Sequence, residues 1–188
     1  SNRYLNSLRY SDYSLETFFR LARSRPYFKN TVFVLVADHT RTRDSFTFEN
    51  QHRIPLLIYE PDGHFVGVNP VVGSQLDILP TVLAFLDLKA KHSSWGRNLL
   101  RIPPDKGFAV SVVGTDLKWR DNNYLLVDNG TDSGALFLCD VHQDPECRRN
   151  VWERHEHEGK RLKATLRSYI SLSQALLSDN RVFPPAAE

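Results

Sequence analysis

The sequence has no long hydrophobic run and no excess of one charge. Its longest apolar stretch, Thr31 to Ala37, is far shorter than the about 20 residues that a membrane-spanning helix needs, and no signal-peptide pattern opens the chain. The 24 basic and 22 acidic side chains leave a formal net charge of +2, which gives no case for nucleic acid or an anionic membrane as a general partner. We therefore expect a soluble globular chain.

Cysteine is scarce, since Cys139 and Cys147 are the only two. They are either free thiols or a disulfide around the short loop Asp140 to Glu146, and a bridge there would contribute roughly 2–3 kcal/mol. A bridge would indicate an oxidising compartment. A zinc site is disfavoured because the usual spacing requires a second pair of ligands.

The first half of the chain alternates helical and strand-like patterns. Apolar residues recur at helical spacing over residues 4–24. The stretch Thr31 to Ala37 is continuous, apolar and mostly β-branched, which is typical of a parallel strand buried on both faces. A second short strand is predicted over Ile54 to Tyr59.

A second helix is predicted over Gln75 to Leu88. Ser74 and Asp77 resemble a capping pair at its start. Pro80 is compatible only with a first turn, so we expect the helix to begin near Asp77. The residues expected to form its buried stripe are Leu76, Leu79, Val82, Leu83 and Leu86.

From Gly107 onward short strand patterns separated by turn residues predict an antiparallel meander. Its strands are expected at residues 108–113, 117–120, 124–127 and 135–139. Helical segments are expected at residues 145–156 and 160–177. The pattern changes from alternating helices and strands to short strands near Ile102-Pro103-Pro104. We therefore expect domains over residues 1–103 and 104–188.

Asp38 and His39 come directly after the first apolar strand. Ligands collect at the carboxyl ends of strands in open α/β sheets, and a carboxylate beside an imidazole suits a divalent cation such as Mn²⁺ or Zn²⁺. The alternative is that Asp38 caps a turn and His39 is an ordinary loop residue. Two ligands cannot hold such a cation alone, so further ligands must come from elsewhere.

Several motifs appear in a fixed order along the chain. They are Tyr10-Ser-Asp12, Asn30 to His39, Arg53 to Tyr59, Ser74 to Thr81, Gly96 to Leu100, Leu136 to Asp140 and Asp144-Pro-Glu146. Together they resemble the sulfatase and lipoteichoic acid synthase family. The element at Gly96 to Leu100 departs from that family by having Asn98 in place of serine.

The resemblance implies an α/β fold: the C-terminal portion of an alkaline-phosphatase-like three-layer α/β/α domain, with a small antiparallel sheet and a C-terminal helix as an appendage. Residues 1–103 would be the C-terminal part of the sulfatase-like catalytic domain, and residues 104–188 the meander and the last helices.

The resemblance also implies a divalent metal held partly by Asp38 and His39. Mn²⁺ is the expected ion, with Zn²⁺, Ca²⁺ and Mg²⁺ as alternatives. A threonine, serine or modified cysteine nucleophile would lie upstream, and the pattern C/S-x-P-x-R of sulfatases does not occur in this sequence. We therefore expect the isolated chain to be inactive.

The parent would act on anionic phosphate or sulfate esters, which are lipid- or glycan-linked in the membrane-bound synthases. We expect a phosphoglycerol transferase anchored by upstream helices, with its catalytic domain on the extracytoplasmic face of a bacterial-type inner membrane. The alternatives are a soluble arylsulfatase or phosphodiesterase of the same superfamily, and a non-catalytic binding domain that kept the fold.

Other polar residues are secondary candidates. Arg41, Arg43 and Arg53 match the oxygens of a phosphate ester, and His52 is a possible proton donor to a leaving group. His155 and His157 stand two residues apart on a predicted helix and therefore face different ways, so we expect them at the surface. We also expect a solvated face from the basic residues Arg148, Arg149, Arg154, Lys160, Arg161, Lys163 and Arg167.

Overall fold

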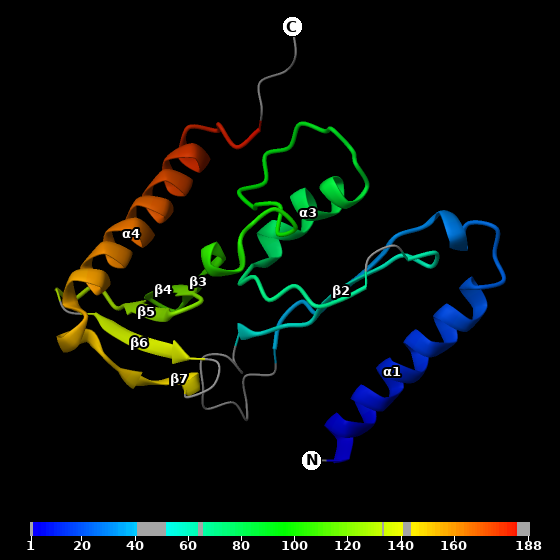
Figure 1. Cartoon of the computed structure of the whole chain (residues 1–188), viewed down its shortest axis with the longest axis horizontal. Coiled ribbons are helices and arrows are strands. Elements are labelled where there is room, and N and C mark those ends of the chain that lie inside the picture. Colours follow the sequence, from blue (N-terminus) through cyan, green and yellow to red (C-terminus); the bar gives the residue numbers. More distant parts are fainter. Residues whose placement is uncertain (1, 41–51, 64–65, 133, 141–143, 184–188) are drawn as a thin grey trace, which may run out of the picture. The chain divides into compact units, whose positions relative to one another are not determined.

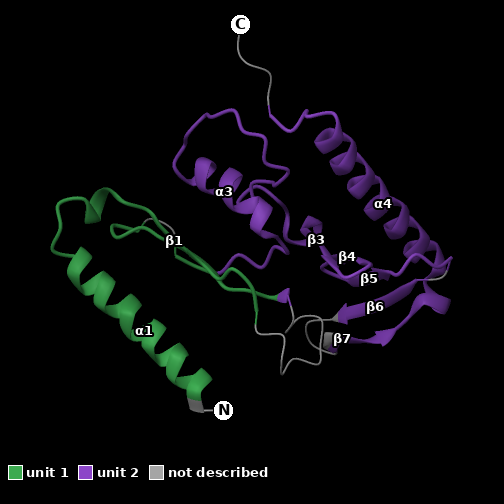
Figure 2. Ribbon diagram, turned by 180° about the vertical axis from the view of Figure 1, so that it is seen from behind, with its two compact units in different colours: residues 1–40, 53–67 green, residues 41–52, 68–188 purple. Residues whose placement is uncertain are grey.

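A computed structural model describes residues 2–40, 52–63, 66–132, 134–140 and 144–183. The chain divides into two compact units (Figure 2). Unit 1 contains residues 1–40 and 53–67, and unit 2 contains residues 41–52 and 68–188. The predicted boundary at residues 103 and 104 is a different division and stays a prediction.

Unit 1 consists of one long helix and a two-stranded antiparallel sheet (Figure 1). Helix α1 covers Asn2–Ala22, and the 3₁₀ turn η1 covers Phe28–Asn30. Strand β1 (Phe33–Val36) pairs with β2 (Leu56–Tyr59), and Phe33 lies opposite Tyr59. The prediction of a parallel strand buried on both faces is wrong for this chain. β1 is antiparallel to its neighbour, and its residues alternate between half-buried and exposed because only one face is covered.

A cluster of aromatic rings holds unit 1 together. The ring of Phe33 in β1 lies 5.1 Å from Phe19 of α1, 5.5 Å from Phe28 and 6.0 Å from Tyr59, measured between centroids. Such pairs add about 0.5–1.5 kcal/mol beyond the burial of their area.

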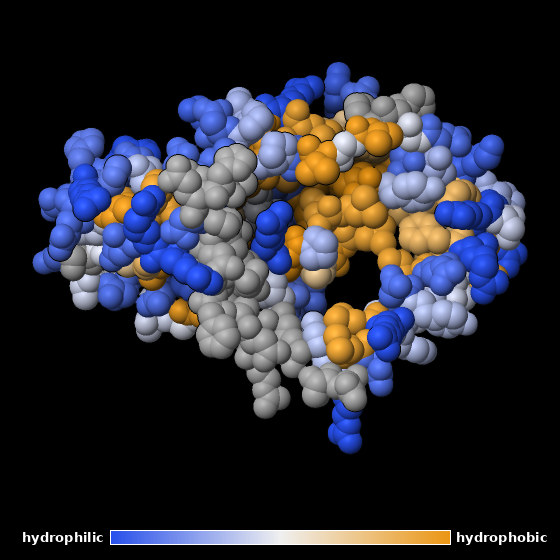
Figure 3. Space-filling model, turned by 60° about the horizontal axis from the view of Figure 1, so that its bottom comes forward, coloured by the Kyte–Doolittle hydropathy of each residue, from blue (hydrophilic) through white to orange (hydrophobic). Residues whose placement is uncertain are grey.

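Much of the remaining apolar surface of unit 1 is exposed. The predicted helix is confirmed, yet its apolar side chains are largely open to solvent, as Leu5 is 52% exposed and Leu21 is 53% exposed. Leu57 in β2 is 55% exposed. Figure 3 shows hydrophobic side chains, in orange, at the surface of the molecule.

In unit 2 the 3₁₀ turn η3 (Gln75–Asp77) leads directly into helix α3 (Ile78–Phe85). The predicted start of this helix is confirmed, and the backbone N–H of Ser74 donates to Asp77 Oδ2 at 2.8 Å. The predicted buried stripe is wrong in its larger part, since only Val82 and Leu83 are half-buried and none of its five residues is fully buried. Leu76, Leu79 and Leu86 are between 43% and 48% exposed, and the residues buried on this segment are Asp77, Pro80 and Thr81.

Asp77 and Thr81 are buried because they bind the segment around Arg97. Asp77 Oδ1 accepts from the Arg97 backbone N–H at 2.6 Å, and Asp77 Oδ2 accepts from the guanidinium at 3.1 Å. Thr81 Oγ1 accepts from the Leu99 N–H at 3.0 Å. The Arg97 guanidinium also lies 3.7 Å above the ring of Phe108. Hydrogen bonds therefore replace the apolar contacts that we expected on this face of the helix.

A five-stranded antiparallel meander follows, preceded by the 3₁₀ turn η4 (Pro104–Lys106). The strands are hydrogen-bonded in chain order (Figure 1). Their bounds are β3 (Phe108–Val113), β4 (Asp116–Asp121), β5 (Tyr124–Asp128), β6 (Ala135–Asp140) and β7 (Asp144–Asn150). The four predicted strands are confirmed.

The C-terminal segment forms the 3₁₀ turn η5 (Trp152–Arg154) and helix α4 (Glu156–Ser178). α4 packs on one face of the meander, which confirms the second predicted helix. The core of unit 2 lies between them and contains the buried residues Trp119, Leu126, Leu136, Val151, Leu162 and Leu166.

The predicted helix over residues 145–156 is wrong, because the first half of that segment is strand β7 and the second half contains only the short turn η5. β7 pairs with β6, and the two strands are linked by a disulfide between Cys139 and Cys147. Both cysteines are buried beside Leu125 on the sheet. Pairing with the preceding strand and a covalent bridge decide this segment, and neither can be read from helical spacing.

The prediction that the basic residues form a solvated face is also wrong in part. Lys163 and Arg167 on α4 turn toward the buried carboxylate of Asp128 at the end of β5. Arg167 Nε donates to Asp128 Oδ2 at 2.6 Å, and Lys163 Nζ lies 3.3 Å from Oδ1. Lys163 also donates to the carbonyl of Thr131. These two cations tie the helix to the sheet.

Candidate functional site

The β1–β2 hairpin positions Asp38 and His39. The last paired residues of the ladder are Val36 and Leu56, and the Ala37 N–H donates to the carbonyl of Pro55 at 3.4 Å beyond them. Asp38 and His39 follow at once, so they leave the end of a strand whose direction is fixed by its pairing. The sequence-based prediction that the pair stands at a strand end is confirmed.

The two side chains lie next to each other and face solvent. His39 Nε2 and Asp38 Oδ2 are 3.5 Å apart, and the side chains are 80% and 87% exposed respectively. Two ligand atoms that each lie about 2.0–2.2 Å from one cation can be at most about 4.4 Å apart. The observed separation of the two atoms lies within this limit, so both atoms can reach one cation.

A hydrogen bond also prepares the imidazole for that role. His39 Nδ1 lies 2.8 Å from the carbonyl oxygen of Thr40. A carbonyl only accepts, so Nδ1 carries the proton, and in the neutral ring Nε2 keeps its lone pair. This arrangement, in which one ring nitrogen donates to a carbonyl and the other faces the metal, is usual for metal-binding histidines. In addition, the His39 backbone N–H donates to Asp38 Oδ1 at 2.9 Å, which leaves Oδ2 on the side of Nε2.

The pair is not a complete metal site. Within the described part of the chain, no group of three or more histidine, cysteine, aspartate or glutamate side chains could hold a metal ion. Stable binding needs four or more ligands for Zn²⁺ and commonly six for the harder cations. The donor chemistry of Asp38 and His39 fits a divalent cation, and further ligands are required.

The other predicted residues divide into three cases. Arg53 is exposed and precedes Pro55 by two residues, so it lies at the same end of the hairpin as Asp38 and His39. His52 is half-buried and belongs to the segment assigned to unit 2. Arg41 and Arg43 lie outside the described residues.

The two histidines expected at the surface are there. His155 and His157 are both exposed. His155 precedes α4, where its Nδ1 lies 3.2 Å from the hydroxyl of Tyr124, and His157 stands on the first turn of the helix. These positions give no indication that the two histidines bind one ligand together.

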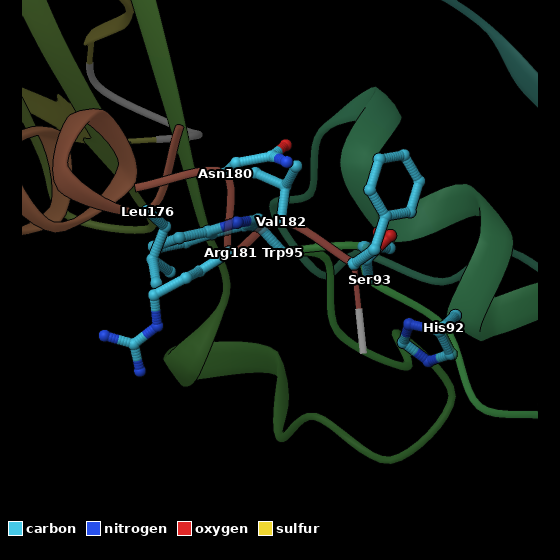
Figure 4. A pocket seen from close by; sticks show the side chains of 9 residues that line it. His92, Ser93, Trp95, Leu176, Asn180, Arg181 and Val182 are labelled. Atoms are coloured by element: carbon cyan, nitrogen blue, oxygen red, sulfur yellow. The ribbon is translucent and has the colours of Figure 1, made fainter. Parts of the chain in front are cut away.

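Sequence reasoning missed a pocket in unit 2. It has a volume of about 640 Å³ and lies between the loop at residues 92–95 and the end of α4 with the residues after it (Figure 4). Trp95 and Arg181 both line it. They are 86 positions apart in the sequence, and no local pattern links them.

Residues 1–88 match the family model described as Sulfatase. The chain is 24% identical over 190 residues to lipoteichoic acid synthase 1 of Bacillus subtilis (strain 168), an alignment that covers 93% of this chain and 27% of that protein. The chain thus spans about a quarter of the length of the curated relative that it matches. The predicted resemblance is confirmed.

A solved structure has the same fold. The crystal structure of a protein in the alkaline phosphatase superfamily from Vibrio parahaemolyticus matches 95% of this chain with a TM-score of 0.78 and 22% sequence identity. The match covers 43% of that protein's chain. It confirms the predicted fold class. None of the described helices is both long and apolar enough to cross a bilayer.

Proposed function

We propose that this chain, which carries the sulfatase-family sequence pattern over residues 1–88 and the alkaline phosphatase superfamily fold, contributes two metal ligands to an enzyme that transfers or hydrolyses phosphoryl or sulfuryl esters. Asp38 and His39 are the ligands. One observation carries the proposal: Oδ2 of Asp38 and Nε2 of His39 stand 3.5 Å apart beyond a strand end, with the histidine tautomer set by Thr40.

The reaction needs positive charge at this point. Phosphate and sulfate esters carry anionic oxygens that repel an attacking oxygen nucleophile. A divalent cation held by Asp38 and His39 would supply the charge that offsets this repulsion. Arg53, at the same end of the hairpin, would bind ester oxygens through its planar guanidinium group. Neither Asp38 nor His39 acts as an acid or a base in this scheme.

The finer proposal is a phosphoglycerol transferase anchored in a membrane by other parts of the parent protein, with its catalytic domain outside the cytoplasm. Two observations support it. The similarity to a lipoteichoic acid synthase extends over 93% of the chain. The Cys139–Cys147 disulfide suits an oxidising compartment. Mn²⁺ is the proposed ion, and the nucleophile is proposed to lie upstream, so the isolated chain should not turn over substrate.

A sulfatase or phosphodiesterase is the second candidate, and the family model that matches residues 1–88 favours it. The parent sequence separates the two. A C-x-P-x-R motif upstream favours the sulfatase, whereas several hydrophobic spans followed by a threonine at a strand end favour the transferase.

The metal pair can be tested on this chain by nuclear magnetic resonance with Mn²⁺ as the probe. Paramagnetic Mn²⁺ at substoichiometric amounts should broaden the resonances of Asp38, His39 and Thr40 before those of other residues. Asp38→Asn and His39→Gln should each weaken this broadening about tenfold or more. His92→Gln, which replaces an exposed histidine of unit 2, is the matched control and should leave it unchanged.

The same substitutions in the full-length parent test the activity. Asp38→Asn or His39→Gln should lower metal-dependent turnover of a phosphodiester or sulfate ester by a factor of about 10² or more. Turnover that persists in both variants would overturn the proposed role of the pair. Clear metal-dependent turnover by the isolated chain would overturn the proposal that the nucleophile lies elsewhere.

A further inference from the structure

Strand β1 of unit 1 has one edge without a partner strand among the described residues. On its other side it pairs with β2, and the two strands form the whole of this sheet (Figure 1). The side of β1 that faces away from β2 is called its outer edge below. An edge strand presents unpaired backbone N–H and C=O groups, which are a template for pairing with another strand.

The register shows which residues present their backbone groups at the outer edge. In an antiparallel pair, opposite residues alternate between pairs that exchange hydrogen bonds and pairs that do not. The Ala37 N–H donates to the carbonyl of Pro55, so these two opposite positions are of the bonded kind. By the same alternation Leu35 is bonded to β2, whereas Val34 and Val36 are not. The N–H and C=O groups of Val34 and Val36 therefore point to the outer edge.

The outer edge carries none of the features that protect exposed edges. Natural proteins protect them with charged side chains, proline or bulges. The seven residues from Thr31 to Ala37 include no charged residue and no proline, and the register of β1 with β2 is unbroken. By contrast, β2 is directly preceded by Pro55 and directly followed by Glu60. This pattern is expected if β1 is paired on both sides in a larger protein.

The hairpin also leaves one apolar face uncovered. Phe33 faces α1, where its ring lies 5.1 Å from the ring of Phe19. Val34 and Val36 lie on the opposite face because side chains alternate along a strand, and both are exposed. Leu56, which lies opposite Val36 in the ladder, is exposed as well. A strand added at the outer edge would therefore extend an apolar sheet.

The strand that occupies the outer edge can come from a second copy of this chain or from another part of the parent protein. Pairing of β1 with β1 of a second copy accounts for the edge alone, and not for the exposed apolar side chains of α1, such as Leu5 and Leu21. The matches cover 43% of the solved chain of the same fold and 27% of the lipoteichoic acid synthase. Most of each protein lies outside the match, which is enough chain to cover the edge, the open face and α1. These observations favour the parent.

We propose that a β-strand from the part of the parent outside this chain pairs with the outer edge through the backbone groups of Val34 and Val36. β1 then becomes an internal strand of a larger sheet. The side chains of the added strand that lie beside Val34 and Val36 are apolar, because an unpaired polar group would be buried there at a cost. The proposal rests on the proposed function only in that this chain belongs to a longer protein, and it requires no metal at Asp38 and His39.

Hydrogen exchange tests the proposal without any substitution. In the 188-residue chain, followed by nuclear magnetic resonance, the Val34 and Val36 amides should exchange at least about tenfold faster than the Leu35 amide. In the full-length parent, followed by mass spectrometry with residue-level fragmentation, the three amides should exchange equally slowly. Val34 and Val36 amides that still exchange about tenfold faster than Leu35 in the parent would overturn the proposal.

Proline substitutions test the edge itself, because proline lacks the N–H and is tolerated in a strand where that group is unbonded. In the 188-residue chain, Val34→Pro should preserve the contact between the rings of Phe33 and Tyr59, as seen in nuclear Overhauser spectra. Leu35→Pro, the matched control, should abolish this contact because it removes a bond to β2. In the full-length parent, Val34→Pro should lower the melting temperature by about 5 °C or more. An unchanged melting temperature, or loss of the ring contact in both variants, contradicts the proposal.

Two outcomes separate this proposal from its alternatives. A dimer of the 188-residue chain in which the Val34 and Val36 amides are protected would assign the outer edge to a second copy and overturn the proposal. Exchange requires no turnover, so a failure of the role proposed for Asp38 and His39 would leave the exchange result unchanged. Conversely, fast exchange at Val34 in a parent whose turnover depends on Asp38 would overturn the strand pairing alone.

Discussion

The two units of this chain bury very different shares of their apolar side chains. In unit 2, Leu126 and Leu136 are fully buried between the meander and α4. Among the described residues of unit 1, only Ala22 and Phe28 are buried. The proposed metal ligands belong to unit 1, where most apolar side chains stay at least partly exposed. Because buried apolar area is the main source of stability, we infer that unit 2 contributes most of the stability of this chain. The proposed metal ligands lie in the less buried unit 1.

The largest predicted effect compares two leucines on strands. Leu136→Ala should lower the free energy of unfolding by about 2–5 kcal/mol, because it leaves a cavity in the core of unit 2. Leu57→Ala should lower it by less than about 0.5 kcal/mol, since Leu57 is already 55% exposed. Urea unfolding followed by circular dichroism measures both. Equal losses would contradict the proposed division between the units.

The next prediction concerns the buried carboxylate of unit 2. Asp128→Asn should destabilise the chain by about 3 kcal/mol at neutral pH, because it leaves the 10%-exposed Lys163 without its counter-ion. Glu158→Gln, which removes the more exposed ion pair with Arg161 on the same helix, should cost less than about 1 kcal/mol. Chemical unfolding of the two variants makes the comparison, and similar losses would contradict a clamping role for Asp128.

The same carboxylate predicts a pH dependence. Burial raises the pKa of Asp128, but hydrogen bonds from Arg167, the Gly130 N–H and Lys163 outweigh it and hold the pKa below the ordinary value of 3.8. A group with a lowered folded pKa stabilises the fold above its unfolded pKa, and this contribution is lost as the pH falls through the folded pKa. The stability difference between wild type and Asp128→Asn should therefore be constant down to about pH 5 and shrink below about pH 4. A difference that stays constant to lower pH would contradict this assignment.

A smaller loss is expected from the disulfide. Replacing Cys139 and Cys147 by serine should cost about 2–3 kcal/mol, because the bridge closes a loop with a sequence separation of 8. Wild type treated with a reductant should then unfold at the same urea concentration as the double variant. If reduction leaves the midpoint unchanged, the bridge does not stabilise the meander.

The smallest stability effect is predicted at the proposed metal ligands. Asp38→Asn and His39→Gln should each change the free energy of unfolding by less than about 0.5 kcal/mol, because both side chains are at least 80% exposed. Thermal unfolding without added metal measures this. A large loss of stability would indicate that the pair has a structural role in unit 1.

Local sequence was sufficient for several parts of the fold. The helical spacing of residues 4–24, the four strands after Gly107 and the last helix were predicted from side-chain periodicity and turn residues. The position of Asp38 and His39 after a strand was predictable for the same reason, since a strand of apolar residues followed by charged ones ends where the charge begins. The ordered motifs also indicated the family.

Only the tertiary structure decided the rest, because it depends on contacts between different elements that the periodicity of one segment does not reveal. Asp77 and Thr81 are buried because they bind the segment of Arg97 and Leu99, so two motifs that are separate in the sequence form one hydrogen-bonded unit. β7 is a strand rather than a helix because it pairs with β6. The sequence by itself determined which residue types could bind a cation and where helices and strands could form. Which polar groups are buried, and which residues share a pocket, depends on burial and long-range hydrogen bonding, which no local pattern encodes.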